Sequence, residues 1–224
     1  MTRARDLSKL LGGTTPTLTV GSAGTEDTKL VFDGNAQDYH IGLDDSSDSL
    51  VIGKGTALGT TPAFTIDSNV YVQQNNLPFL FLQGNDLNSR TLPNDGKFFN
   101  TNVGSQQAGL IVGSSSITTA GSNAITYNSG TGAFTVPVTG KYYIEGRFRY
   151  ASTGDEAVAV VINTNDNHDC AYLILQCTEA TGLHISTVAN LAANDFITFR
   201  HNSGGDRIFF MATTHTSASV IFLG

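Results

Sequence analysis

The strongest constraint on the fold is a stretch of alternating apolar and polar residues between Tyr127 and Tyr150. In its first half, Phe134, Val136 and Val138 recur at every second position, which is the period of a strand with one buried face. Pro137 has no N–H to donate to a neighbouring strand. We therefore expect this first strand to lie at a sheet edge or to contain a bulge.

The alternation resumes after Gly140 and divides a second strand into two faces. One face carries Tyr142, Ile144, Phe148 and Tyr150, and the other carries Glu145, Arg147 and Arg149. Residues 128–132 precede both strands and read Asn-Ser-Gly-Thr-Gly, which favours a turn because glycine and asparagine tolerate positive φ. The segment therefore predicts an antiparallel β-structure with one aromatic, buried face.

Short apolar runs separated by Gly, Asn, Asp and Ser continue to residue 224. They predict strands at 79–82, 110–112, 124–127, 157–163, 170–177, 183–189, 195–201, 207–213 and 218–223. This number of strands and turns is typical of a β-sandwich or barrel. The sequence thus predicts an all-β chain whose larger part is a β-sandwich or barrel.

An earlier segment has the same character on a smaller scale. Apolar runs at 29–32, 39–43, 49–52, 63–66 and 69–72 alternate with turn residues. Strands this short cannot bury a core within so few residues, and such units usually share a core with copies of themselves. We therefore predict three parts: a peptide and linker at 1–27, a β-rich stalk at 28–76, and a head at 77–224.

Residues 3–11 carry the one helical pattern. Leu7, Leu10 and Leu11 fall at positions i, i+3 and i+4, and two glycines follow. A helix this short is marginal alone, so it is either a frayed terminus or a docking peptide that buries its leucines in a larger assembly. No apolar core of a signal peptide precedes it, and no run of about 18 apolar residues predicts a membrane span.

The net charge and the cysteine content limit the kinds of binding partner and the cellular compartment that we expect. The formal net charge is −7, whereas nucleic-acid binding requires a basic surface, so we expect no nucleic-acid partner. Cys170 and Cys177 flank an unbroken apolar run and would lie ~23 Å apart in one strand, too far for a disulfide. Two free thiols fit folding in a reducing cytoplasm.

The head resembles a known family. Tyr127, Phe134, Gly140 and Tyr142 stand at the spacing found in the globular head of complement first-component q and its tumour-necrosis-factor-like relatives. The core signature that the resemblance gives is Tyr127, Phe134, Gly140, Tyr142, Ile144 and Phe148. Gly146 departs from it, standing where an aromatic residue is expected. The resemblance implies a ten-stranded jelly roll that forms trimers and does not itself imply a ligand.

The stalk resembles a different group of proteins. The string TKLVFDGNAQDYHIGLDDSSDSLVIGKGTALGTTPAFTIDSN is similar to a module repeated in structural proteins of tailed phages that infect marine bacteria. This resemblance implies a virion protein that is assembled in the host bacterial cytoplasm.

No catalytic constellation is expected. A Gly-x-Ser-x-Gly elbow is missing, and neighbours in the run His168-Asp169-Cys170 would point to opposite faces of a strand. His184, His201 and His215 are also spaced singly, so we expect no metal site or cofactor. The turn at 44–48 is rich in Asp and Ser and is either a solvated turn or a cation site that lacks a calcium-loop pattern.

Loops at the far end of a jelly roll are where such folds carry function. Short polar side chains beside an aromatic ring would suit sugar hydroxyls, although these segments can equally be plain turns. The candidate receptor-binding residues are Asn163, Asn165, Asp166, His168, Tyr172, His201 and Arg207.

Together these features predict a phage virion protein, a homotrimeric fibre or spike. Its N-terminus would dock on a tail adaptor or capsid protein, and its head would bind a host-surface glycan or protein. The alternative is a capsid-decorating protein without receptor binding. A small polysaccharide-degrading spike is a third reading, disfavoured because no catalytic residues can be assigned.

Overall fold

A computed structural model describes residues 19–84, 89–94, 96–100, 117–120, 124–151, 154–163, 169–177, 181–202, 204–210 and 215–224. Every regular element within these ranges is a strand, and the predicted all-β class is confirmed. Consequently none of the described elements is a helix that could cross a membrane. The predicted N-terminal helix, with Leu7, Leu10 and Leu11, lies outside the described ranges.

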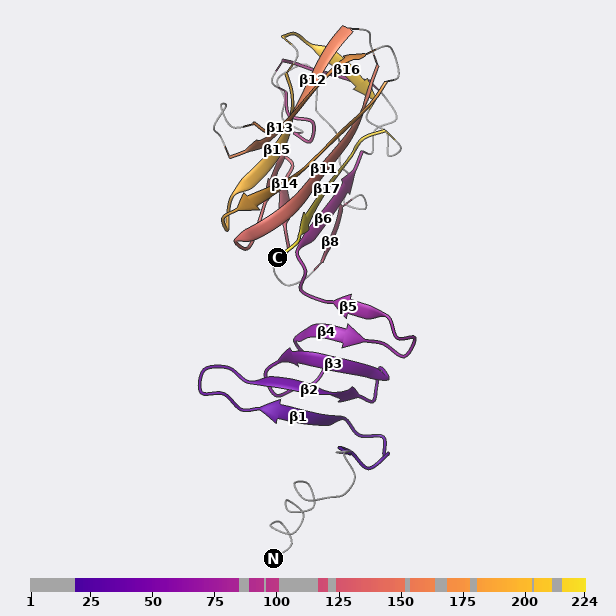
Figure 1. The fold of residues 1–224 in the computed structure, drawn as a ribbon. Helices are drawn as coiled ribbons and strands as arrows, with labels where there is room; N and C mark the ends of the chain where they lie inside the picture. The colour runs from indigo at the N-terminus through magenta and orange to yellow at the C-terminus, as the bar shows by residue number, and fades with distance from the viewer. Residues whose placement is uncertain are drawn as a thin grey trace, which may run out of the picture. The chain divides into compact units, whose positions relative to one another are not determined.

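The chain divides into two compact units, residues 1–75 and 76–224. The first unit is a five-stranded antiparallel sheet in which each strand pairs with the next along the chain (Figure 1). Its strands are β1 (Thr28–Phe32), β2 (Tyr39–Asp44), β3 (Ser49–Lys54), β4 (Pro62–Ile66) and β5 (Val72–Gln74).

The prediction of a strand at 69–72 was wrong, because a turn occupies most of this segment. Val70 has φ 66°, and the Asp67 carboxylate accepts hydrogen bonds from the N–H groups of Asn69 and Tyr71, both at 2.9 Å. An aspartate that binds the backbone ahead of it favours a turn over a strand. The strand β5 therefore begins only at Val72.

The second unit is a sandwich of two antiparallel sheets. The first sheet has five strands, in the order β13 (Asp169–Cys177), β12 (Gly154–Ile162), β15 (Phe196–His201), β10 (Ala133–Thr135) and β9 (Thr126–Asn128). Cys170 and Cys177 stand at the two ends of the single strand β13, as predicted. They therefore cannot pair with each other.

The second sheet has seven strands and is built around the long strand β11 (Gly140–Tyr150). β14 (Gly182–Leu191) pairs along one edge of β11, and β17 (Ser217–Phe222) and β16 (Arg207–Phe210) pair along the other edge. The sheet is completed by β6 (Phe79–Gln83), β8 (Ile117–Ala120) and β7 (Ser89–Leu92). β7 and β8 were not predicted, and the predicted strand at 110–112 lies outside the described ranges.

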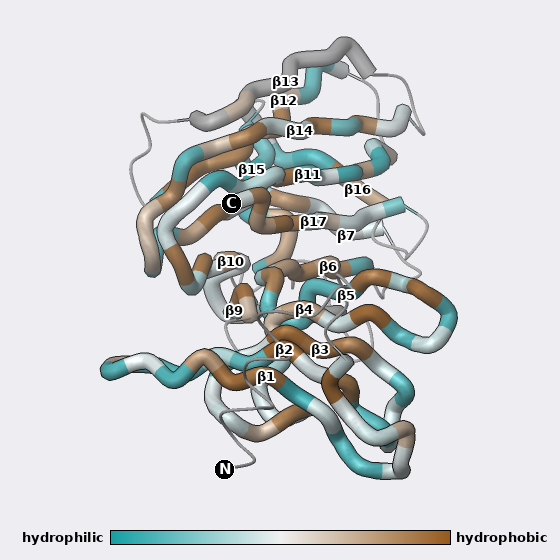
Figure 2. Tube along the Cα trace, turned by 60° about the horizontal axis from the view of Figure 1, so that its bottom comes forward, coloured by the Kyte–Doolittle hydropathy of each residue, from teal (hydrophilic) through white to brown (hydrophobic). Residues whose placement is uncertain are grey.

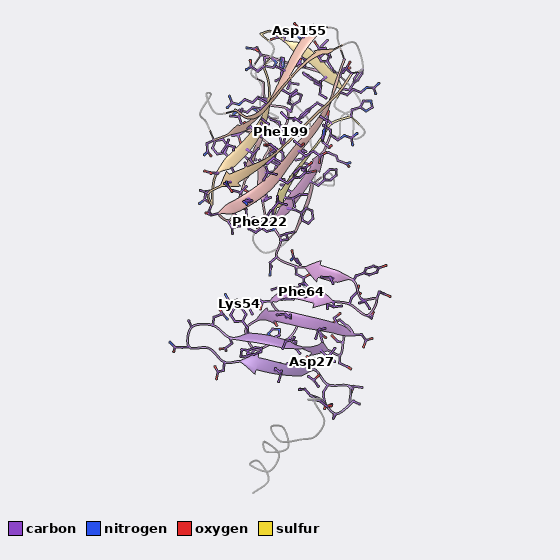
Figure 3. The ribbon with its side chains drawn as sticks, viewed as in Figure 1. Asp27, Lys54, Phe64, Asp155, Phe199 and Phe222 are labelled. Carbon is purple, nitrogen blue, oxygen red and sulfur yellow. The ribbon has the colours of Figure 1, made fainter. Side chains whose placement is uncertain are left out.

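The core of the second unit lies between its two sheets and is largely aromatic. Phe98 stacks on Phe148 with ring centroids 3.8 Å apart, and Phe199 lies among these rings in the interior (Figure 3). The predicted buried face of β11 is confirmed, since its four apolar side chains are at most 1% exposed. A side chain at Gly146 would come within 2.7 Å of Phe148 and Phe199, which explains why no aromatic residue stands there.

The expectation for Pro137 was wrong. The strand β10 ends at Thr135, before the proline, and it lies inside its sheet between β9 and β15. After the strand, the Val136 N–H still donates to the Asp195 carbonyl at 2.9 Å. The proline therefore ends the ladder instead of marking an edge strand.

Candidate functional site

Asn163, one of the predicted receptor-binding residues, forms hydrogen bonds within the chain just after β12. It has φ 58°, and its side-chain amide donates to the Asp195 carboxylate at 2.9 Å. Its side-chain oxygen accepts from the Phe196 N–H at 3.1 Å. These bonds tie the end of β12 to the start of β15.

The opposite end of β15 holds a buried pair of polar side chains. His201 Nδ1 lies 2.5 Å from Glu156 Oε1, and both side chains are fully buried. His201 Nε2 lies 2.8 Å from the Gly205 carbonyl. The imidazole therefore bridges the Glu156 carboxyl group and the Gly205 carbonyl, and both of its nitrogens are hydrogen-bonded.

This burial corrects the expectation that His201 contacts a receptor, because its side chain cannot be reached from the surface. Arg207 stays partly accessible, with 27% of its side chain exposed and its Nε atom 3.8 Å from Glu156 Oε2. Asn163 and Arg207 lie at opposite ends of β15, a strand of six residues. They are thus some 17–20 Å apart and do not form one site.

The structure does not describe the side chains of the other predicted receptor-binding residues. Asn165, Asp166 and His168 lie outside the described residues, and Tyr172 is described only as a backbone position in β13. The loop surface expected at the end of the head is therefore represented here by Asn163 and Arg207 alone.

The structure instead shows a polar pocket on the outer face of the seven-stranded sheet. It has a volume of about 530 Å³ and is lined by Phe81, Gln83, Glu145, Arg147, His215, Ser217 and Ser219. Pairing in register places the pocket residues of β6, β17 and β11 side by side. The alternation along β11 correctly assigned Glu145 and Arg147 to the solvent side. It could not reveal a pocket assembled from strands so distant in the chain.

Charge is unevenly placed around this pocket. The carboxylate of Glu145 makes one side of the pocket acidic, and it accepts a hydrogen bond from His184 at 3.0 Å. Near the other side, Arg149 donates to Nε2 of His215 and lies 5.0 Å from the centre of the Phe210 ring. Burial, followed by the charge of Arg149, lowers the pKa of His215, so its ring stays neutral and accepts this bond.

These side chains suit a neutral ligand rich in hydroxyl groups. Serine hydroxyls and the Gln83 amide both donate and accept, and Glu145 and Arg147 add one strong acceptor and one strong donor. The ring of Phe81 offers an apolar surface of the kind that packs against a sugar ring. Within the described part of the chain, no three His, Cys, Asp or Glu side chains come close enough to hold a metal ion.

The first unit presents a second candidate surface. Register pairing places ten apolar side chains on one side of its sheet, here called the apolar face: Leu30, Phe32, Tyr39, Ile41, Leu43, Leu50, Ile52, Phe64, Ile66 and Val72. Each of them is exposed or only half-buried. In Figure 2 the apolar segments recur on neighbouring strands of this unit.

The acidic turn of the first unit connects β2 and β3. Asp48 has φ 50°, and Ser46 donates to the Asp44 carboxylate at 2.6 Å. Asp27 accepts from the Asp45 N–H at 3.0 Å. The turn is therefore held by an internal hydrogen bond and by one to Asp27. Among the described residues, its carboxylates are not part of any group of three or more His, Cys, Asp or Glu side chains that could hold a metal ion.

Comparison with known proteins assigns the fold. No protein-family model matches the chain, and no curated protein matches it in sequence. Among solved structures, the Eiger tumour necrosis factor from S. frugiperda is similar with a TM-score of 0.52 and 14% identity, over 66% of this chain and 94% of Eiger.

Two further structures share 12% identity and cover 66% of this chain. They are the globular domain of zebrafish complement 1qA, with a TM-score of 0.43 and 98% of its length covered, and murine APRIL, with 0.46 and 100% covered. At 14% identity, the similarity to Eiger concerns the fold alone. The chain therefore contains a jelly roll of the tumour-necrosis-factor type.

Proposed function

We propose that this protein is a structural protein of a tailed-phage virion, assembled as a homotrimeric fibre or spike that exposes a head for adhesion to a host surface. The observation that carries the proposal is the contrast between the two units. The second unit has a large buried core, whereas Val51 is the one buried hydrophobic side chain among the described residues of the first unit. A sheet without a core needs other chains for stability.

Each part has a role in this proposal. Leu7, Leu10 and Leu11 would dock the chain on a tail adaptor or capsid protein, and residues 28–76 would form the stalk. The resemblance of residues 25–69 to a repeated phage module supports the virion assignment. The jelly-roll fold supports trimerisation, because the resemblance to complement and tumour-necrosis-factor heads implies it.

Adhesion would come from many weak contacts. A shallow polar pocket such as the one beside Glu145 and Arg147 offers only a few hydrogen bonds to a glycan. Three heads on one fibre, and many fibres on one particle, would raise the overall affinity by roughly 10²–10⁴. The alternative is a capsid-decorating protein, in which the same assembly stabilises the particle and the head binds no receptor.

Light scattering on the full chain and on residues 76–224 tests the assembly. Trimers of both would place a trimer contact in the head, and a trimeric full chain with a monomeric head would move the contact to the first unit. A monomeric full chain at micromolar concentration would refute the fibre.

Binding of the full chain to a glycan array tests adhesion, and it distinguishes a receptor-binding fibre from a capsid-decorating protein. Arg147→Ala should lower glycan binding by about tenfold, because a hydrogen bond to a charged group contributes roughly 1.5 kcal/mol. Lys141→Ala is the matched control, since Lys141 is also exposed on β11 but does not line the pocket. A trimer that binds no glycan and no host cell would favour the decorating role.

A further inference from the structure

We infer that the apolar face of the first sheet is the surface through which copies of this chain bind one another. This inference rests on the proposed homotrimer and identifies a contact surface within it. The partners are the same sheets of the other copies, with the apolar faces turned toward a shared axis.

The apolar face leaves as much apolar surface in water as the largest patches on typical monomers. Exposed fractions are 44% for Leu30, 61% for Phe32, 53% for Tyr39, 52% for Leu43 and 40% for Ile52. With Val72 at 59% exposed, these side chains leave on the order of 600 Å² exposed if each offers about 200 Å². The largest patch on a typical monomer is about 300–600 Å², and a standard interface buries about 800 Å² per partner.

The chain itself covers part of the opposite face of the sheet. His40 is 1% exposed and Val51 is 2% exposed, and both lie on that side. Nδ1 of His40 hydrogen-bonds the Gly55 carbonyl at 2.9 Å, and Lys29 donates to the carbonyl of Thr56. The loop after β3 thus lies over the polar face, while the large apolar side chains lie on the uncovered side.

Charge favours a second copy over a charged partner. The chain holds 19 acidic residues, yet none occupies a paired strand position on the apolar face. Lys54, at the end of β3 (Figure 3), is its one charged residue at these positions. Two copies can therefore meet without opposing like charges at the centre, which is a requirement for a face that binds itself.

The middle of the face is continuous across four strands. Leu30 pairs with Ile41, Ile41 with Ile52, and Ile52 with Phe64. Such a row gives a flat apolar surface like the inner face of one sheet in a β-sandwich. In a trimer, three such faces turned toward one axis would supply the core that each sheet lacks.

Thiol labelling of the full chain tests which face is covered. Ile52→Cys places a thiol at the centre of the apolar face, and Val31→Cys places one on the opposite face. The two native side chains are equally exposed at 40%, so they form a matched pair. Leu43→Cys, at a position 52% exposed on the apolar face, repeats the test if Ile52→Cys fails to fold.

The expected result is an oligomer in which Ile52→Cys reacts roughly tenfold or more slowly than Val31→Cys, after subtraction of the unsubstituted chain. An oligomer in which both thiols react equally fast would overturn this inference and leave the homotrimer standing. A monomer with equal rates would overturn both. A monomer with a protected Ile52→Cys would show that the same chain covers the face, which also overturns the inference.

Discussion

The buried contact between Glu156 and His201 leads us to predict how much stability the head loses when Glu156 is replaced. Replacing Glu156 with leucine keeps much of the side-chain volume but removes the carboxylate 2.5 Å from the imidazole. The variant leaves Nδ1 of the fully buried His201 ring without its hydrogen-bond partner. This loss destabilises the folded state.

The size of the effect follows from the burial of both groups. Removing one partner of a buried hydrogen-bonded pair leaves the other group unsatisfied, which costs about 1–3 kcal/mol for neutral groups and about 3–5 kcal/mol for ionised ones. The loss of the contact between Glu156 and Arg207, which lie 3.8 Å apart, adds little because the Arg207 side chain is partly exposed to water. We expect a loss of about 3 kcal/mol, a large share of the roughly 5–15 kcal/mol that stabilises a domain.

The double variant Glu156→Leu, His201→Phe provides the control. The ring of His201 already packs against Phe209, with centroids 5.6 Å apart, so a phenyl ring fits the same neighbours. We expect it to recover all but about 1–2 kcal/mol, the cost of leaving the Gly205 carbonyl without its donor.

Urea unfolding of all variants at one fixed protein concentration measures these differences. A loss below about 1 kcal/mol in the single variant would refute a stabilising buried bond between Glu156 and His201. The same conclusion would follow if the double variant were no more stable than the single one.

Three further predictions concern other parts of the head. Gly146→Ala should destabilise it by about 1–3 kcal/mol through overpacking, whereas Gly182→Ala should change little because its added carbon meets nothing within 4 Å; thermal unfolding of both variants checks this. Burial raises the pKa of Tyr127 from 10.0 to about 12. The resulting stability is complete below pH 10 and is lost as pH rises toward 12, so Tyr127→Phe should weaken this alkaline loss of stability in urea titrations at pH 9 and 11. Asn163→Ala should cost about 1–3 kcal/mol by removing its bond to Asp195 and leaving alanine at positive φ, which urea unfolding would show.

The sequence predicted most of the elements that depend on local pattern. Alternation along residues 140–150 identified β11 and its buried face, because a strand covered on one side must alternate. It failed at β7 (Ser89–Leu92), a short polar segment whose strand character comes from pairing with β16. It also failed at Val70, where the side-chain bonds of Asp67 outweigh the preference of an apolar residue for a strand.

The candidate sites were harder to predict, because they depend on which strands become neighbours. The pocket on the head joins Phe81 to Ser219 and Glu145 through pairings that no local pattern encodes. The burial of His201 had one usable signal: Glu156 begins a run of apolar residues, and a carboxyl group inside such a strand needs a hydrogen-bonding partner. The choice of His201 as that partner follows from the register between β12 and β15.

The pairing of β6 with β17 has a consequence for the order in which the chain folds. Phe79 pairs with Ile221, so this contact closes a loop of roughly 140 residues, and contacts of such long range form slowly. The first unit, by contrast, contains only pairings between consecutive strands and can form early. During folding, the strands of the first unit can therefore pair while β6 still lacks its neighbour β17. In that interval the open strand edges of the second unit are sites at which aggregation can begin.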